Sequence, residues 1–281
     1  MAKRRATLSD LLNDLTFKVL YDKYKLIALN AYEYEGLPDT VKPRHIEREL
    51  FSEGRAIFFR DPSMSFMALK ASPTGRVNYQ NEPVEYRAVG IGYDKVYPVD
   101  DCVIIENNLL QIPTEQFILF YVNKLTEAER TMDVNIKAAK TPIIMLCDDK
   151  DVLSFKRLFS QVDGNVPAIF ADKNINLDSI TALDTKAKFL GNELMTYKKS
   201  VENELLTFLG ENNANTDKRE RLITDEANAN NQLIESFMEL GLVARQEAVE
   251  KINAKYNLNI SVRRRELSTM EDVENVENSD V

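Results

Sequence analysis

The stretch TEQFILFYVNKLTEAERTMDVNIKAAK, residues 114–140, decides the fold class of this 281-residue chain. Its apolar residues recur at intervals of three and four, as on one face of an α-helix: Phe117, Tyr121, Leu125, Ala128, Met132 and Ile136. Thr114 is suited to cap the first turn. Pro142 ends the pattern, because the residue before a proline avoids the helical conformation. The stretch therefore predicts a helix about 40 Å long.

Residues 184–210 repeat this pattern and predict a second long helix. Its apolar stripe consists of Leu190, Leu194, Tyr197, Val201, Leu205 and Phe208. Because the two helices have nearly equal length and flank a short segment, we expect an antiparallel hairpin that carries this segment at its tip. Each helix has only a narrow apolar seam, so a lone pair buries little surface, whereas subunits placed side by side bury more. The pattern favours an oligomer.

The segment between the two helices, residues 141–183, is predicted to form a small α/β unit. The stretches PIIMLC (142–147) and GNVPAIFA (164–171) have the composition of buried strands. The stretch DVLSFKRLFSQV (151–162) between them has helical spacing. A connection of this length permits the two strands to pair in parallel.

The first part of the chain, residues 1–113, predicts a helix over 10–34, a short helix over 45–51 and a small antiparallel sheet. Its strands are separated by the turn segments RDPS, SPTGR and VYPVDD and are expected at residues 55–59, 65–71, 84–93 and 102–107. Towards the C-terminus, residues 245–256 predict another helix and residues 259–264 a strand. The fold class predicted from these elements is α+β.

A long polar stretch, residues 211–232, follows Gly210 and has Leu222 and Ile223 as its only large apolar residues. Long polar loops inside compact domains are usually functional or disordered. Its basic residues are interleaved with acids: Lys218, Arg219 and Arg221 stand among Asp217, Glu220, Asp225 and Glu226. By residue chemistry alone, a solvated loop with internal ion pairs is favoured. The acidic residues 266–281 predict a disordered tail.

The composition excludes several classes of function. A net charge of −9 excludes a polycation that coats nucleic acid, so any such contact must be local or must enclose the nucleic acid without neutralising it tightly. Cys102 and Cys147, without a secretory pattern, predict reduced buried thiols in a cytoplasmic setting. No apolar run reaches the roughly 18 residues of a membrane span, so no membrane partner is expected. The single histidine, His45, lacks companions for a metal site or a catalytic pair, and no phosphate-binding loop is present.

The sequence thus predicts no enzyme, no cofactor and no metal, but two alternatives stay open. One is a metal-dependent nuclease or phosphotransferase that uses Asp148, Asp149 and Asp151, although acids between a strand and a helix usually serve as caps and turns. The other is a cytoplasmic helical adaptor. Among the basic clusters, Lys3, Arg4 and Arg5 are suited to phosphate, and residues 263–265 (three arginines) are equally suited to a neighbour's acids.

Short motifs along the whole chain resemble the portal proteins, also called upper collar or head–tail connector proteins, of small short-tailed bacteriophages. In order, the matching stretches are EYEGLPDTVKP (33–43), FFRDPSMSFMA (58–68), KTPIIMLCDD (140–149), DGNVPAIFA (163–171), NELLTFLG (203–210), NANTDKRERLITDEA (213–227) and EAVEKINAKYNLNISV (247–262). Each is short, and their specificity comes from the shared order.

The resemblance implies a non-enzymatic ring of twelve subunits at one capsid vertex, with double-stranded DNA passing through its centre during genome packaging and ejection. It implies a wing (1–113 and 233–265), two stem helices (114–140 and 184–210), a clip (141–183) and a tunnel loop (211–232). The implied partners are further copies of the chain, the major capsid protein and scaffold, tail (lower collar) proteins, and a packaging ATPase, which in some relatives works with a packaging RNA. The implied location is the virion, after assembly in the host cytoplasm.

The resemblance also implies roles for basic residues. Lys218 and Arg219, with Arg221 close by, correspond to the basic tunnel loop that projects into the channel. Lys3, Arg4 and Arg5 correspond to a cluster that contacts the nucleic acid of the packaging machine. The lysine rings of the family's stem fall on Asp184 and Glu193, with three candidate lysines close to them: Lys186, Lys188 and Lys198.

Overall fold

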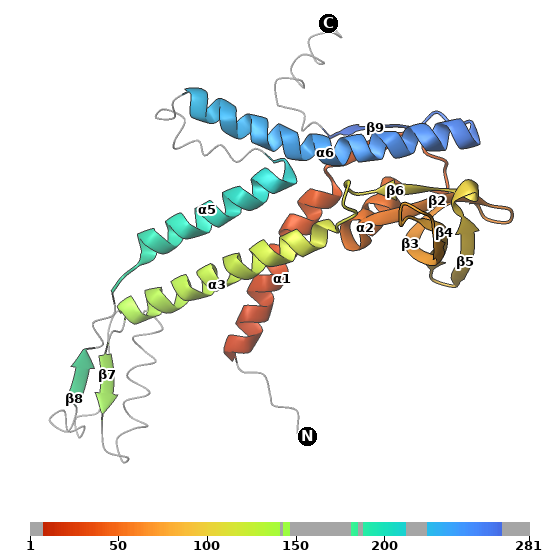
Figure 1. Ribbon diagram of the computed structural model, residues 1–281. Coiled ribbons are helices and arrows are strands. Elements are labelled where there is room, and N and C mark those ends of the chain that lie inside the picture. Colours follow the sequence, from red (N-terminus) through yellow and green to blue (C-terminus); the bar gives the residue numbers. More distant parts are fainter. Residues whose placement is uncertain (1–7, 141–142, 147–180, 185–187, 212–223, 266–281) are drawn as a thin grey trace, which may run out of the picture. The chain divides into compact units, whose positions relative to one another are not determined.

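The computed structural model describes residues 8–140, 143–146, 181–184, 188–211 and 224–265 (Figure 1). The chain divides into two compact units, of which the first takes in Met1–Glu127 and Lys198–Val281 and the second takes in Ala128–Tyr197. Two helices, α3 Thr114–Lys140 and α5 Gly191–Leu209, cross from one unit to the other, whereas the large sheet lies wholly in the first unit.

The first unit contains a five-stranded antiparallel sheet in the order β5-β4-β3-β2-β6 (Figure 1). The strands are β2 Arg55–Asp61, β3 Ser65–Val77, β4 Pro83–Gly90, β5 Tyr93–Pro98 and β6 Cys102–Glu106, and η1 Val99–Asp101 is a short 3₁₀ turn between the last two. The predicted small antiparallel sheet is confirmed.

Two of the predicted strand boundaries are wrong. Residues 84–93 form two strands, because the chain reverses at Gly92, whose φ of 72° suits a tight turn. The segment SPTGR belongs to β3, which continues through it to Val77. Gly75 takes a positive φ within the register shift between Thr74 and Val77, so the glycine there marks a bulge and not the end of a strand.

The first helix, α1 Leu8–Leu29, ends earlier than the predicted residue 34. Residues Tyr32–Glu35 form strand β1, which pairs antiparallel with β9 Ser261–Arg264. The expectation failed because the partner strand lies more than two hundred positions later in the chain, and its hydrogen bonds override a local helical pattern. The short second helix is confirmed as α2 Pro43–Glu53, which ends at Gly54.

Both faces of the sheet are buried. Alternate residues of β2 point to opposite faces, and Phe58 and Phe59 are both fully buried. Phe58 packs in the cluster that includes residues of α2, α6 and β9, and Phe59 packs with Tyr93 and Tyr97 on the other face. Residues on both faces of β2 therefore belong to the core of the first unit.

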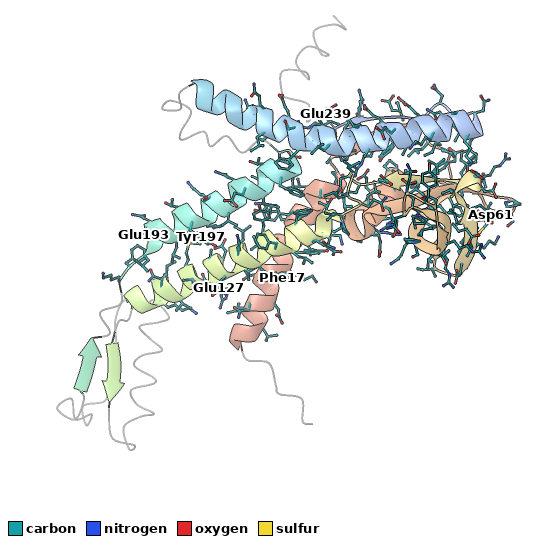
Figure 2. The ribbon with its side chains drawn as sticks, viewed as in Figure 1. Phe17, Asp61, Glu127, Glu193, Tyr197 and Glu239 are labelled. Atoms are coloured by element: carbon teal, nitrogen blue, oxygen red, sulfur yellow. The ribbon has the colours of Figure 1, made fainter. Side chains whose placement is uncertain are left out.

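The buried carboxylate of Asp61, at the end of β2, connects the β2–β3 hairpin to β5 (Figure 2). It accepts hydrogen bonds from Lys95 Nζ at 2.7 Å and from the Tyr93 hydroxyl at 2.7 Å, and from the Ser63 backbone at 2.9 Å. These donors, with Lys95 foremost, hold the pKa of Asp61 well below its usual range.

The long helix predicted over residues 114–140 is confirmed as α3 Thr114–Lys140. Its first half packs with α1, α2 and the end of α5 Gly191–Leu209 in a second core. The fully or nearly fully buried members are Tyr24, Phe51, Ile118, Val122, Leu125, Val201, Leu205 and Leu209. Towards the other ends of these two helices the predicted stripes are exposed, since Ile136 is 56% and Tyr197 is 49% exposed.

The second long helix begins later than predicted. Asp184 belongs to strand β8 Thr181–Asp184, and the chain becomes helical only at Gly191. The side chain of Asn135 on α3 donates to the Lys188 carbonyl at 2.8 Å and accepts from the Leu190 backbone N–H at 2.9 Å. These two bonds satisfy the Lys188 carbonyl and the Leu190 N–H outside the helix. The local helical pattern of the sequence does not predict them.

In the second unit, β8 pairs antiparallel with β7 Ile143–Leu146. Strand β7 confirms the strand predicted in PIIMLC, whereas β8 was not predicted. The helix predicted over residues 151–162 and the strand predicted over 164–171 lie outside the described residues, so their parallel pairing stays a prediction.

The last long helix, α6 Thr224–Tyr256, has 33 residues and is far longer than the predicted 245–256. Residues 224–232, which were assigned to the polar loop, are its first turns. Further along the helix, Ile234, Met238 and Ile252 are buried in the first unit. This tertiary packing stabilises the first turns of α6, which have no apolar pattern of their own.

Gly210 ends α5, as its position predicted. Its φ is 75°, and the Glu211 backbone N–H donates to the Leu206 carbonyl at 2.8 Å, as in a left-handed helix cap. The Gly210 carbonyl also accepts from Arg264 Nη2 of β9 at 2.6 Å. A Cβ atom at this glycine would lie 1.8 Å from Met238 Cγ, so α5 and α6 approach each other where a side chain does not fit.

We expect Gly210→Ala to lower the free energy of unfolding by about 3 kcal/mol, because it combines left-handed strain with a clash against Met238. Gly92→Ala is the matched control: its φ is 72° but nothing lies within 4 Å of the added Cβ, so it should cost only about 1 kcal/mol. Urea unfolding of both variants measures the difference. Equal losses would show that the contact with Met238 contributes nothing.

Candidate functional site

A buried ion pair between α6 and α2 forms the polar centre of the first unit. Arg245 and Glu47 are each 3% exposed and meet through two parallel bonds, Nε to Oε1 and Nη2 to Oε2, both 2.8 Å long. Arg245 Nη2 also donates to Asn107 Oδ1 at 3.1 Å, and Nη1 donates to the Gly241 carbonyl at 2.9 Å. The guanidinium lies 4.1 Å from the centroid of the Tyr32 ring.

The charges of this cluster are fixed by their surroundings. Burial opposes the charge of Arg245, but the carboxylate of Glu47 outweighs it and raises the pKa of Arg245 above its ordinary value. The Tyr34 hydroxyl donates a hydrogen bond to Glu47 Oε1 at 2.7 Å. Burial, together with that carboxylate, raises the pKa of Tyr34 well above its usual range. The arginine and the carboxylate are occupied by protein partners, so the cluster is suited to holding helices together and not to binding a charged ligand.

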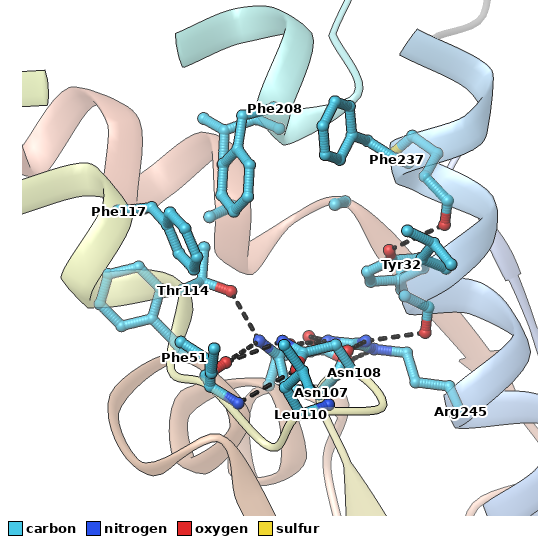
Figure 3. A pocket seen from close by; sticks show the side chains of 18 of the residues that line it. Tyr32, Phe51, Asn107, Asn108, Leu110, Thr114, Phe117, Phe208, Phe237 and Arg245 are labelled. Carbon is cyan, nitrogen blue, oxygen red and sulfur yellow. Dashed lines mark hydrogen bonds and ion pairs between the residues drawn. The ribbon is translucent and has the colours of Figure 1, made fainter. Parts of the chain in front are cut away.

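An apolar pocket of about 470 Å³ lies beside this cluster (Figure 3). Aromatic rings from α3, α5 and α6 form one wall, where the Phe117 and Phe208 centroids are 4.3 Å apart and the Phe208 and Phe237 centroids are 5.7 Å apart. Phe51 and Tyr32 also line it, and Asn107 and Arg245 lie at its polar side. Pockets with this lining bind apolar groups.

The loop that borders the pocket presents two leucines to solvent. Leu109 is 89% and Leu110 is 74% exposed. The side chain of Asn108 fixes this loop, because its Oδ1 accepts the backbone N–H groups of Leu110 and Ile112 and its Nδ2 donates to the Ile112 carbonyl at 2.9 Å. A preformed loop that exposes large apolar side chains is typical of a surface for protein contact.

Two of the nine basic residues predicted as site residues lie in the described part of the chain. Lys188 is exposed and precedes α5, and Lys198 lies on α5. Lys186 lies outside the described residues, as do the predicted tunnel-loop residues Lys218, Arg219 and Arg221 and the N-terminal Lys3, Arg4 and Arg5. The structure brings no pair of these nine together among the residues that it describes. The acids Asp148, Asp149 and Asp151 of the nuclease alternative also lie outside them.

The C-terminal arginines have partners within the chain. Arg263 forms ion pairs with Glu33 and Glu35 across the β1–β9 pair. The guanidinium of Arg264 binds the Gly210 carbonyl. They therefore close the small sheet and hold the end of α5 in place.

The remaining sequence candidates have structural roles. His45 Nδ1 accepts the Lys42 backbone N–H at the start of α2, and burial together with Arg44 and Arg48 lowers the pKa of His45. Cys102 is a buried free thiol, as predicted, and burial raises its pKa to about 11. Cys147 lies outside the described residues.

The sequence did not identify the Arg245–Glu47 cluster, because its two halves are 198 positions apart. One local signal was present: Arg245 lies between Leu242 and Ala248 on the buried face of a helix, where an unpaired charge is costly. An arginine at such a position predicts a buried acid elsewhere in the chain, although it does not say which.

The first unit thus combines a buried polar cluster, an apolar pocket and exposed apolar residues, and exposed apolar surface is typical of proteins that contact partners. A sequence model of the phage connector (GP10) family matches residues 5–268. The chain therefore belongs to this family, the portal or connector proteins of the bacteriophage head–tail junction. It is a structural, non-enzymatic protein of the virion, which sets the nuclease and adaptor alternatives aside.

Solved structures of phage portals are similar to this chain. The portal and tail of native bacteriophage P68 contain a chain with 17% sequence identity and a TM-score of 0.51, and the match covers 99% of both chains. The HK97 family phage portal protein from Corynebacterium diphtheriae has 12% identity and a TM-score of 0.44 over 94% of this chain and 96% of that chain. The first similarity shows that the fold is of the mixed α+β portal type.

Within the described ranges, no helix combines the length and the apolar character that a bilayer span requires.

We expect Glu47→Leu to cost about 3–5 kcal/mol of unfolding free energy, because it leaves the Arg245 charge buried without its partner. The double variant Glu47→Leu/Arg245→Met removes both charges and should lose less than Glu47→Leu alone. Arg263→Ala is the control for an ion pair at the surface, where the arginine is 69% exposed, and should cost less than about 1 kcal/mol. Urea unfolding of these variants and of Arg245→Met alone measures the losses, and a loss in the double variant equal to the sum of its two single variants would contradict the coupling.

Proposed function

We propose that the chain assembles as a ring of twelve subunits at one capsid vertex and conducts double-stranded DNA into and out of the head. The observation that carries this proposal is the family match over residues 5–268, which takes in every described helix and strand. The fold similarity to the portal of bacteriophage P68 supports it.

The proposed parts follow the elements of the chain. Helices α3 and α5 are the stem, residues 141–183 between them are the clip that meets the motor and the tail, and residues 1–113 with residues 233–265 are the wing. The segment after Gly210 is the tunnel loop, and α6 begins its return to the wing at Thr224. Ile136 and Tyr197, at the far ends of α3 and α5, are exposed apolar residues. Stem helices that pack against neighbouring subunits would expose such residues in the isolated chain.

The charge of the chain fits a conduit. A net charge of −9 per subunit weakens DNA binding at the channel wall, and a wall that does not neutralise phosphate lets the duplex slide. Basic residues then act locally: Lys218, Arg219 and Arg221 in the tunnel loop, Lys3, Arg4 and Arg5 towards the packaging machine, and the stem candidates Lys186, Lys188 and Lys198. The proposed partners are capsid and scaffold proteins, a packaging ATPase and tail proteins.

The ring itself is the first test. Purified full-length chain should give rings with a central hole in negative-stain images and a twelvefold mass in native mass spectrometry. The reason is that each subunit leaves apolar helix surfaces exposed, which a ring would cover. A chain that stays monomeric at micromolar concentration would refute the proposal. Rings with another number of subunits would overturn only the number twelve.

We expect Lys218→Ala/Arg219→Ala to leave ring formation and DNA uptake intact and to impair retention of packaged DNA. The two positive charges are proposed to face phosphate in the channel, and their loss weakens that contact. Packaged genomes protected from nuclease, counted per particle after centrifugation, measure retention. Glu220→Ala in the same stretch is the control and should retain DNA normally. Unchanged retention in the double variant, or failure to form rings, would count against the role.

A further inference from the structure

The last strand of the first unit ends beside the apolar pocket. Strand β9 pairs with β1 so that Arg264 lies opposite Tyr32, which lines the pocket. The Arg265 backbone N–H then donates to the carbonyl of Ala31, another lining residue, at 3.0 Å. The chain therefore leaves the described residues at the side of the pocket that the end of α1 and the start of β1 form.

The side chain of Arg264 reaches a second side of the same pocket. Its Nη2 donates to the Gly210 carbonyl at 2.6 Å, and Gly210 directly follows Phe208 and Leu209, which line the pocket from α5 (Figure 3). Arg264 and Arg265 thus contact the ends of both α1 and α5. Residues 266–281 start next to both of these pocket-lining segments.

The polar side of the pocket offers no free cation among the described residues. Arg245 uses all five of its N–H groups on Glu47, Asn107 and Gly241. An acidic side chain that entered the pocket would therefore lack a partner, which is costly. The rest of the lining is mainly aliphatic and aromatic. The pocket consequently favours apolar side chains over acidic ones.

The sequence after Arg265 begins with apolar residues of the required kind. Leu267 and Met270 are its first large apolar residues, and the only later ones are valines, at positions 273, 276 and 281. An extended chain covers at most about 3.6 Å per residue, so Leu267 lies within about 7 Å of Arg265 and Met270 within about 18 Å. A pocket of about 470 Å³ is large enough to bury most of a small molecule and has room for both side chains.

We propose that Leu267 and Met270 of the C-terminal segment dock in the apolar pocket of their own chain. Their short connection to β9 keeps both side chains at high effective concentration near the pocket, so a contact that is weak between separate molecules is favoured within one chain. The acidic residues that follow Met270 stay in solvent. A partner that uses the pocket then has to displace this segment, which makes the segment an internal competitor for the site.

An internal disulfide tests the docking in the full-length chain. Met270→Cys/Leu240→Cys places one thiol on the segment and one on a residue that lines the pocket, and it keeps Leu267 as an anchor. After mild oxidation this variant should form a bridge within one chain. Mass spectrometry after alkylation then shows the loss of two thiols, and a non-reducing gel still shows a single chain.

Met270→Cys/Leu26→Cys is the matched control. Leu26 is 65% exposed and Leu240 is 62% exposed, but Leu26 does not line the pocket. Leu26 is also close to the point where the segment starts, because its carbonyl accepts a hydrogen bond from Asn30, whose Oδ1 accepts one from Arg265. A segment that moves freely therefore reaches Leu26 as readily as Leu240.

The Leu240 pair should give at least about fivefold more internal bridge than the Leu26 pair, because docking raises the effective concentration only at the pocket. Equal yields, or no bridge from the Leu240 pair, would refute the docking. Covalent dimers or a ladder from the Leu240 pair would show that the segment of another copy occupies the pocket, which overturns docking within one chain. The single variant Met270→Cys keeps the native Cys102 and Cys147 and should form no bridge.

A neutral apolar dye gives a second readout that does not depend on oxidation. Leu267→Ser/Met270→Ser should raise Nile red fluorescence at least about twofold over the parent chain, because the dye no longer competes with a tethered occupant. Val273→Ser/Val276→Ser removes two apolar side chains further along the same segment and should leave the fluorescence unchanged. Equal fluorescence in the first variant and the parent, or an equal rise in both variants, would overturn the proposal. Circular dichroism of both variants should match the parent, because residues 266–281 contribute no described helix or strand.

Discussion

The buried ion pair between Arg245 and Glu47 is the constraint on which the first unit depends. A guanidinium at 3% exposure is tolerable only when its donors are all used, and here the partners come from α2, from the loop after β6 and from α6 itself. Tyr34 of β1 binds the same carboxylate, which ties in the strand that pairs with β9. These elements therefore have to assemble together, because without any one of them a buried polar group would lack a hydrogen-bond partner.

This arrangement also explains why an open apolar pocket persists beside a tightly bonded polar centre. The cluster fixes α6 relative to α2, and Gly210 fixes the end of α5 against Met238, so the aromatic wall between them is held at a set distance. The pocket is therefore part of the packing of this unit. Exposed apolar surface of this kind is typical of proteins that contact partners.

Elements with complete local signals were predictable, and those that depend on distant partners were not. Helix α3 has its cap, its periodicity and its proline stop within one stretch, and its predicted bounds match the structure. The helix predicted over residues 10–34 was cut short because β9 pairs with Tyr32–Glu35. Residues 224–232 had no apolar pattern and were assigned to a loop, although packing further along α6 makes them helical. None of the residues of the Arg245 cluster was predicted as a site.

The sequence by itself determined the α+β class, the long helix α3, the small antiparallel sheet and the membership of the family, because periodicity, turn residues and ordered motifs are local properties. Only the tertiary structure decided which charged residues are buried, where the pocket lies and which helix faces stay exposed. The physical reason is that burial is a property of pairs of surfaces. Glu47 and Arg245 become one group only when residues 198 positions apart are brought to 2.8 Å.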